Sequence, residues 1–256
     1  MKRLLALILL LAASDSAVAQ TIPLPRPRPA PATDAPKVEA PAPPSACRLR
    51  LTEELAVAPS LPPIEGPGDC GAPDVVRLVA VVLADGSRVA LTPPATLRCG
   101  MAEAIVRWVR EDVAAAVHDI GGSLRSVDNY ASFDCRGRNN IVGAKTSEHG
   151  KGNALDIRSF KLADGKVVKL ADPQAAKDFR DRMKKSVCAR FSTVLGPGSD
   201  GYHEDHIHVD LMDRSPGRFR MCQWDVHDPE PAAETATAVP LPPPRPKIEA
   251  KGGRKL

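Results

Sequence analysis

The sequence contains no hydrophobic run of the length that a membrane-spanning helix needs. Its longest apolar run, Leu4 to Ala13, is too short to cross a bilayer, which takes about 20 apolar residues. Lys2 and Arg3 precede this run and Ala17-Val18-Ala19 follows it, which is the arrangement of a cleavable signal peptide. We therefore expect residues 1–19 to be a signal peptide and the mature protein to be soluble, in the periplasm or outside the cell.

Cysteine pairs of the form C-x-x-C are also missing, which argues against a cysteine zinc site and against a dithiol redox motif. An even number of cysteines in an exported chain indicates a set of disulfides. Pairing each cysteine with a sequence neighbour predicts Cys47–Cys70, Cys99–Cys135 and Cys188–Cys222, one of the 15 connectivities that six cysteines allow.

The central part of the chain has no net charge. The last thirteen residues hold five basic side chains and one acidic side chain, a net charge of +4 that equals that of the whole chain. A domain without net basic charge is not expected to bind nucleic acid, whose phosphates are neutralised by lysine and arginine. The basic tail is either a solubilising linker or a contact for anionic wall polymers or lipid headgroups.

Proline divides the chain into regions. Nine prolines fall in residues 20–45 and seven in residues 229–256, and such stretches bury little apolar surface. We expect both to be disordered, the first as a linker and the second as a basic tail. The remaining segment, 46–228, is long enough to form one domain with its own hydrophobic core.

Local patterns within this segment predict an α+β fold. Asp-Gly lies between apolar arms in Val79–Leu91 and in Ile157–Leu170, which indicates two β-hairpins. Apolar residues at helical spacing predict a helix over Met101–Ile120 and a second from Asp172 to about Ala189, with Asp172 as its N-terminal cap. We expect a small antiparallel sheet with helices packed on one face and a metal site on its open face.

Four of the six histidines lie in two short segments. His149 and Asp156 are seven residues apart, and Gly150 and Gly152 between them allow the backbone to turn. Some fifty residues later, His206, His208 and Asp210 alternate with the apolar residues Ile207, Val209 and Leu211. This alternation predicts a strand with the three polar side chains on one face. Two histidines and a carboxylate form the ligand set of a catalytic zinc, whose fourth position holds water.

These segments resemble a known family. The segments SEHGKGNALDIRSFKLADG and VLGPGSDGYHEDHIHVDL, with LRCGMA at 97–102, the stretch from Tyr130 to Arg136, and Cys222, resemble the extensin-like C-terminal domain of bacterial proteins. The motif S-x-H-x-x-G-x-A-x-D followed by H-x-H is similar to that of lysostaphin-type enzymes, D-alanyl-D-alanine peptidases and the hedgehog domain. The resemblance implies one Zn²⁺ per domain, bound by His149, Asp156 and His208.

The general base has two candidates. Similarity to the endopeptidase branch implies that His206 moves the proton, with His203 nearby. In the dipeptidase branch a glutamate takes this role, and its position is occupied here by Asp205. We favour His206, because its ordinary pKa suits proton transfer near neutrality and it is predicted to share a strand face with His208. Asp210, on the same face, is expected to orient a ligand histidine.

The resemblance also implies a substrate site. Related D-alanyl peptidases hold the substrate carboxylate with an upstream arginine, for which Arg136 and Arg138 are the candidates, while Ser147 binds substrate or braces its loop. We therefore expect an exported zinc-dependent peptidase, a carboxypeptidase or an endopeptidase, whose partner is peptidoglycan or another cell-wall peptide. The alternatives are a wall-binding or scaffolding domain that contains zinc without turnover, and a zinc hydrolase of some other periplasmic peptide.

Overall fold

The structure is a computed structural model that describes residues 43–214 and 219–226. The expected signal peptide, most of the Pro-rich linker and the basic tail therefore lie outside the described residues. Within the described ranges, no helix combines the length and the apolar character that crossing a membrane requires.

One mixed sheet runs through the domain in the strand order β1-β5-β6-β7-β8-β11-β10-β12, with β2 paired to β5 and β9 paired to β8. Its described strands are β1 Ala56–Val57, β2 Ser60–Leu61, β5 Val75–Val82, β6 Arg88–Arg98, β7 Leu124–Ala131, β8 Ala154–Leu162, β9 Val167–Lys169, β10 Thr193–Leu195, β11 Ile207–Asp210 and β12 Met221–Gln223. A separate pair is formed by β3, Ile64–Glu65, and β4, Gly71–Ala72.

The prediction of a small, purely antiparallel sheet is wrong in both size and strand direction. The sheet has ten strands within the described residues, and two of its pairs, β6–β7 and β10–β12, are parallel. Several strands are only two or three residues long, as β1, β9 and β12 show. Such strands contain too few residues to display an alternation of apolar and polar side chains, so the sequence pattern underestimates the sheet.

Both expected hairpins are confirmed. Strand β5 pairs antiparallel with β6, and β8 pairs antiparallel with β9. The glycine of each Asp-Gly dipeptide lies in the turn with a positive φ, +82° at Gly86 and +90° at Gly165. A side chain is disfavoured at such φ values, which explains why glycine follows the aspartate in both turns.

The first expected helix is confirmed as three consecutive segments. These are α2, Cys99–Trp108, a π-helical turn over Val109–Val113, and α3, Ala114–Asp119. The second helix, α4, spans Lys177–Arg190, so it begins five residues after Asp172 and ends one residue after Ala189. Asp172 does act as a cap, but its carboxylate accepts the Gln174 N–H in a preceding turn, at 2.8 Å. A short helix of five residues, α1, spans Ala46–Arg50.

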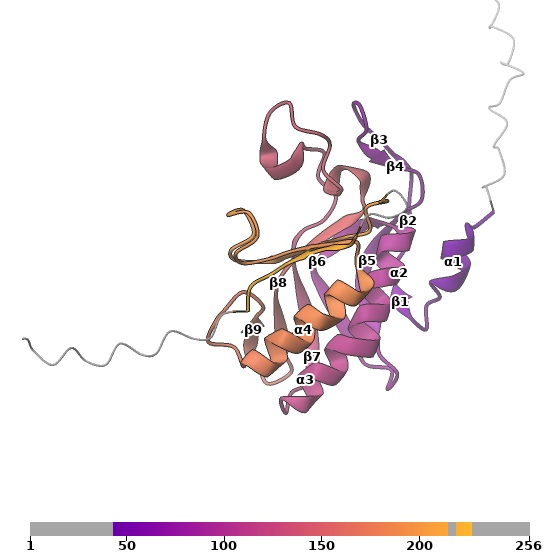
Figure 1. The fold of residues 1–256 in the computed structure, drawn as a ribbon. Helices are drawn as coiled ribbons and strands as arrows, with labels where there is room; N and C mark the ends of the chain where they lie inside the picture. Colours follow the sequence, from indigo (N-terminus) through magenta and orange to yellow (C-terminus); the bar gives the residue numbers. More distant parts are fainter. Residues whose placement is uncertain (1–42, 215–218, 227–256) are drawn as a thin grey trace, which may run out of the picture. The chain divides into compact units, whose positions relative to one another are not determined.

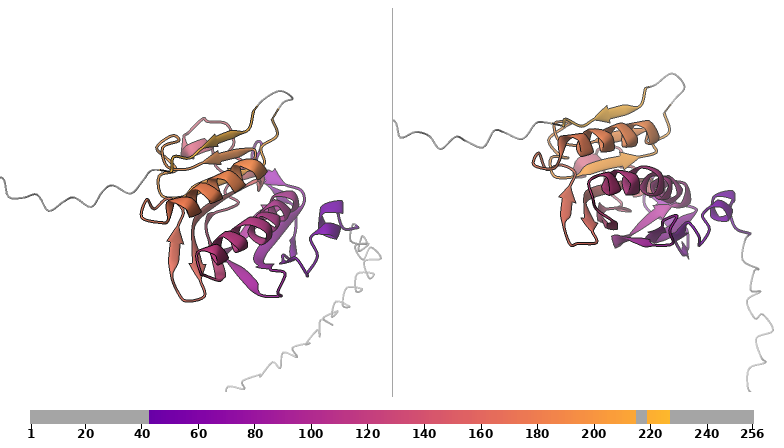
Figure 2. Two further views of the ribbon diagram at one scale, coloured as in Figure 1. Left: turned by 60° about the horizontal axis from the view of Figure 1, so that its bottom comes forward. Right: turned by 90° about the horizontal axis from the view of Figure 1, so that it is seen from below.

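The helices α2, α3 and α4 pack against one another and lie in front of the sheet in Figure 1. Figure 2 shows α4 lying beside the α2–α3 rod. Trp108 of α2 is fully buried at this junction, with its ring 6.0 Å from Phe160 and 6.1 Å from Phe191. Its indole N–H donates to Ser186 Oγ of α4 at 2.9 Å, which satisfies the polar group that burial removes from water.

The core residues of β8 and β11 determine which face holds the site. Leu155 and Ile157 of β8, and Ile207 and Val209 of β11, belong to the hydrophobic core. Because successive side chains of a strand point to opposite faces, Asp156 and His208 project from the other face of the sheet.

The disulfides correct two of the three expected pairings. The bonds are Cys47–Cys99, Cys70–Cys135 and Cys188–Cys222, so only the last pairing is confirmed. The Cα atoms of the first two pairs are 6.0 and 5.7 Å apart, within the usual reach of a disulfide. Pairing by sequence proximity fails here because the fold brings together cysteines that are separated by 52 and 65 positions.

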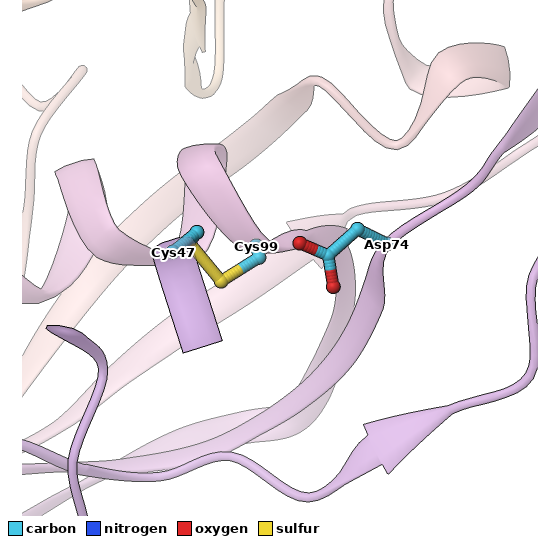
Figure 3. A group of neighbouring side chains, drawn as sticks. All are labelled: Cys47, Asp74 and Cys99. Atoms are coloured by element: carbon cyan, nitrogen blue, oxygen red, sulfur yellow. A yellow bond between two sulfur atoms is a disulfide. The ribbon is translucent and has the colours of Figure 1, made fainter. Parts of the chain in front are cut away.

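The first disulfide joins α1 to the start of α2. Figure 3 shows Cys47 and Cys99 beside Asp74, a trio whose side chains could resemble a metal site. The two sulfurs are bonded to each other, so neither is a thiolate that could bind an ion. The carboxylate of Asp74 accepts the Ser45 hydroxyl at 2.6 Å, and its backbone carbonyl accepts the Cys99 N–H at 2.7 Å. The disulfide and these hydrogen bonds therefore have a structural role, in which they connect the segment around α1 to the start of α2.

Candidate metal centre

Three side chains that the sequence proposes as ligands meet in a buried cluster. Asp156 Oδ1 lies 3.1 Å from His149 Nε2 and 2.8 Å from His208 Nδ1, and the two ring nitrogens are 3.1 Å apart. His149 comes from the single 3-10 turn His149–Lys151, Asp156 from β8 and His208 from β11. Asp156 and His208 are register partners across the two strands, so the sheet itself holds two of the three donors.

The two glycines of the first segment bring His149 to this cluster in different ways. Gly152 adopts the left-handed conformation, with φ at +62°, and ends the turn that carries His149. At Gly150 the requirement is space, since a Cβ atom there would lie 3.0 Å from Thr146 Cγ2 and 3.1 Å from Cys70 Sγ. The left-handed backbone thus favours glycine at position 152, and the close packing favours glycine at position 150.

Each histidine of the cluster has a partner for its outward nitrogen. His149 Nδ1 lies 2.7 Å from the backbone carbonyl of Ser132, which can only accept a hydrogen bond, so Nδ1 carries the proton and Nε2 is free. His208 Nε2 lies 3.2 Å from Asp210 Oδ2, in the position expected for Asp210. Metal-binding histidines in proteins usually have such a partner on the nitrogen that does not bind the ion.

These donors fit a small divalent cation. In a tetrahedral zinc site, bonds of about 2.0–2.2 Å place neighbouring donor atoms about 3.3 Å apart. The three separations in the cluster, 2.8 to 3.1 Å, need only slight widening to meet that geometry. The residues present can therefore hold a metal ion through two nitrogens and one oxygen.

Without a metal ion, protons hold the cluster together. Burial alone would raise the pKa of Asp156, but its close contacts with the His149 and His208 rings keep this pKa well below its usual range. Burial alone would lower the pKa of His208, but hydrogen bonds to Asp156 and Asp210 outweigh it and raise the pKa to about 9. The metal-free cluster at neutral pH is therefore an ion pair of carboxylate and imidazolium, in which a cation can replace the proton.

Two further histidines lie beside the cluster. His206 precedes β11, and its Nε2 lies 3.6 Å from Asp156 Oδ2, while its Nδ1 lies 2.8 Å from Asp205 Oδ1. The ring of His203 lies 5.1 Å from that of His206, and its Nδ1 is 2.7 Å from Asp200 Oδ1. Burial lowers the pKa of His203 despite this carboxylate. Both rings are buried next to the three donors without joining them, and a proton-transfer role for either stays a prediction.

A cavity opens onto the metal cluster. Both candidate substrate-binding arginines and Ser147 line it, together with His149, His203 and His208. The guanidinium Nε of Arg136 lies 3.0 Å from Asp134 Oδ2, whereas Arg138 Nη2 contacts Met212 Sδ at 3.7 Å. Ser147 Oγ accepts the His149 N–H at 3.3 Å, which agrees with the bracing role considered for this residue.

Several residues of the site were missed from the sequence. The buried carboxylate of Glu148 accepts from Asn153 Nδ2 at 2.6 Å and from Lys151 Nζ at 2.8 Å, and so closes the turn between two expected ligands. Its place directly before His149 was a usable signal. Asp200, three residues before His203, was another. The carbonyl of Ser132 gave no signal, because every residue has one.

Fold and site together define a mixed α/β domain whose sheet carries a buried His/His/Asp cluster capable of holding a metal ion. The family model described as extensin-like protein C-terminus matches residues 45–223 of this domain. The chain belongs to that family, as its motifs indicated. No curated protein and no solved structure matches the chain significantly, and the expected kinship with zinc peptidases stays a prediction. The three disulfides indicate a compartment outside the cytoplasm.

Proposed function

We propose that this domain is an exported zinc-dependent peptidase that hydrolyses a peptide bond in bacterial cell-wall peptidoglycan. One observation carries the proposal, the convergence of His149, Asp156 and His208 within about one ligand spacing at the edge of a cavity. Three protein donors leave a coordination position for water, which distinguishes a catalytic zinc from a structural one with four protein ligands.

The choice of zinc rests on the donors. Two imidazole nitrogens with one carboxylate oxygen are a ligand set that Zn²⁺ accepts, whereas Mg²⁺ and Ca²⁺ prefer sites made of oxygen atoms alone. A bound zinc ion would lower the pKa of a water molecule to about 7 and polarise the carbonyl of the bond to be cut. The hydrogen bonds to Ser132 and Asp210 would keep the two imidazoles oriented for this task.

The residues around the donors supply the other roles. His206, whose Nε2 lies 3.6 Å from Asp156 Oδ2, would accept a proton from a nucleophile bound at the cluster. Arg138 and Arg136 line the cavity and can bind a substrate carboxylate with two hydrogen bonds each. Arg138 is the better placed of the two, since within the described ranges it forms no ion pair, while Arg136 is paired with Asp134.

Peptidoglycan as the substrate rests on compartment and resemblance. The apolar run Leu4–Ala13 with its basic start and small-residue end predicts export, and the disulfides agree with an oxidising compartment. The resemblance of the motif to that of wall-cleaving zinc peptidases then favours the stem peptides of the wall, whose free ends carry the carboxylate that the arginines would bind.

The test is to incubate the zinc-loaded protein with purified peptidoglycan fragments, both single stems and cross-linked pairs, and to read product masses. Separation of cross-linked stems with the gain of one water indicates an endopeptidase, and loss of a terminal residue indicates a carboxypeptidase. His149→Ala and a chelator-treated sample should give neither. If the zinc-loaded protein binds the fragments but leaves all masses unchanged, the peptidase proposal is wrong and the wall-binding alternative replaces it.

A further inference from the structure

Two neighbouring strands of the sheet each contain one extra residue next to the metal cluster. In the β7–β8 ladder Asp128 faces Ser159, while Asn129 faces Ile157, so Arg158 has no partner on β7. Asn129 faces Ile157 and Ala131 faces Asp156, so Tyr130 has no partner on β8. Such bulges redirect side chains and are common beside functional sites.

The two bulged residues stack on each other. The guanidinium carbon of Arg158 lies 3.8 Å from the centre of the Tyr130 ring, the geometry of a cation–π contact. The register shift at Arg158 leaves Ile157 and Phe160 both in the core, three residues apart instead of two. The alternation of core and surface side chains along β8 is therefore interrupted at Arg158, which has no partner on β7.

From this stack, contacts lead back to His206. Arg158 Nη2 lies 3.5 Å from Asp205 Oδ2, Asp205 Oδ1 lies 2.8 Å from His206 Nδ1, and the ring of His206 lies 4.8 Å from that of Tyr130. Tyr130, Arg158, Asp205 and His206 thus form a closed ring of four contacts, which we term the His206 clamp.

We propose that Asp205 is a positioning residue that fixes His206 in one tautomer, with Arg158 and Tyr130 holding the pair in place. The inference rests on the proposed function for its catalytic meaning and decides between the two candidates for the general base. An ionised carboxylate can only accept a hydrogen bond, so the proton of the neutral imidazole must be on Nδ1. The lone pair is then on Nε2, which is the nitrogen that faces Asp156.

The surroundings of Asp205 agree with this role. Both of its oxygens are occupied, one by His206 and the other by the guanidinium of Arg158. Asp205 lines a depression that it shares with Arg158 and Lys169. The hydrogen bond from His206 lowers the pKa of Asp205, which keeps the carboxylate ionised and able only to accept. A carboxylate that acts as the base would need an oxygen that is free to contact a water molecule at the metal.

The clamp can be tested without any substrate. Nitrogen-15 NMR of the zinc-loaded protein reports which imidazole nitrogen carries the proton, with the His206 signals assigned by their loss in His206→Ala. We expect the Nδ1–H tautomer in the wild type and in the control Lys169→Ala, which alters the same depression away from His206. Asp205→Ala should move the proton to Nε2 or give a mixture, with one zinc per domain retained. Asp205→Asn, which keeps an acceptor oxygen, should restore much of the Nδ1–H form.

A second variant guards against misfolding. Arg158→Met keeps the length of the side chain but removes its charge, and should broaden or split the His206 signals without loss of zinc. The inference is overturned if wild-type His206 carries its proton on Nε2, if Asp205→Ala leaves the tautomer unchanged, or if Asp205→Ala releases zinc.

A cleavage assay with peptidoglycan fragments distinguishes failure of the clamp from failure of the proposed function. If peptidoglycan is cleaved, Asp205→Ala should lower kcat about 10–100-fold with little change in KM, less than the loss on removing the base itself. If no fragment is cleaved, the peptidase proposal fails while the NMR result still decides the clamp. If cleavage occurs and the tautomer is unaffected by Asp205, only the clamp is wrong.

Discussion

Asp156 and His208 face each other across the antiparallel pair β8–β11, with Asp156 Oδ1 2.8 Å from His208 Nδ1. The carboxylate and the imidazole are thus held by backbone hydrogen bonds of the sheet, while the third donor, His149, is held by a glycine-dependent turn. This arrangement places two donors before any metal ion binds, which reduces the ordering that binding would require.

The first prediction concerns metal content. We expect one zinc per domain, and loss of the ion in His149→Ala, Asp156→Ala and His208→Ala, because each variant leaves only two protein donors. Elemental analysis of the purified proteins measures this. His118→Ala, whose side chain is 86% exposed on α3, is the control and should keep the metal. A folded wild type that stays metal-free in added zinc would contradict the assignment.

The second prediction concerns pH. A proton on His208, whose pKa in the metal-free domain is about 9, must leave when the ion binds, so zinc affinity should rise as the pH increases toward 9. The stability of the metal-free domain should change in the opposite sense. Because this pKa lies above the ordinary value of 6.5, the stabilisation is complete below about pH 6.5 and is lost as the pH rises to about 9.

Zinc titration and urea unfolding at a series of pH values measure both trends. The His118→Ala control should follow the wild type in both experiments. Zinc affinity that is independent of pH over this range would show that His208 is neutral in the free domain.

The third prediction concerns the division of roles among the histidines. His206→Ala should keep its zinc and lose about 10²–10⁴-fold in rate, the usual contribution of a general base. His208→Ala should lose zinc and activity together. Cleavage assays on peptidoglycan fragments, paired with metal analysis, distinguish the two. If Asp205→Ala abolishes turnover while His206→Ala stays active, the carboxylate is the base.

The fourth prediction concerns covalent structure. Thiol labelling of the denatured, unreduced protein should detect no free cysteine, since all six are paired. Proteolytic mapping without reduction should recover peptides linked as Cys47–Cys99, Cys70–Cys135 and Cys188–Cys222. Recovery of a Cys47–Cys70 or Cys99–Cys135 peptide as the main species would support pairing by sequence neighbours instead.

The fifth prediction concerns the turn that carries His149. Gly152→Ala should destabilise the protein by about 1–2 kcal/mol from the left-handed backbone alone. Crowding adds to this, since the new Cβ would lie 3.1 Å from the Arg98 backbone nitrogen. Gly143→Ala is the matched control, with φ at +79° but no atom within 4 Å of its Cβ. Equal unfolding free energies for the two variants would rule out the crowding contribution.

The sequence predicted the parts of the site that depend on local pattern. Alternation from His206 to Leu211 identified the strand that carries His208, and its buried neighbours Ile207 and Val209 are in the core as expected. The spacing of His149 and Asp156 around two glycines identified the turn. These predictions succeed because a period of two and a glycine-dependent turn are properties of neighbouring residues.

The parts that failed depend on contacts between distant segments. Strand order determines which cysteines meet, and no local signal distinguishes Cys99 from Cys70 as the partner of Cys47. The bulges at Tyr130 and Arg158 interrupt an alternation that otherwise reads as regular strand, so neither residue was suspected of contacting the site. Helix α4 begins after the predicted start because Asp172 caps a turn that precedes the helix. The local sequence is compatible with a cap of either a turn or a helix at this position.

The order of the ligands along the chain restricts when the metal centre can exist. His149 and Asp156 are synthesised ahead of His208, which follows His149 by 59 residues. Until β11 is added beside β8, a partly emerged chain holds only two of the three donors and binds an ion weakly. Under the proposed function, metal loading would therefore be a late step that waits until β11 has paired with β8.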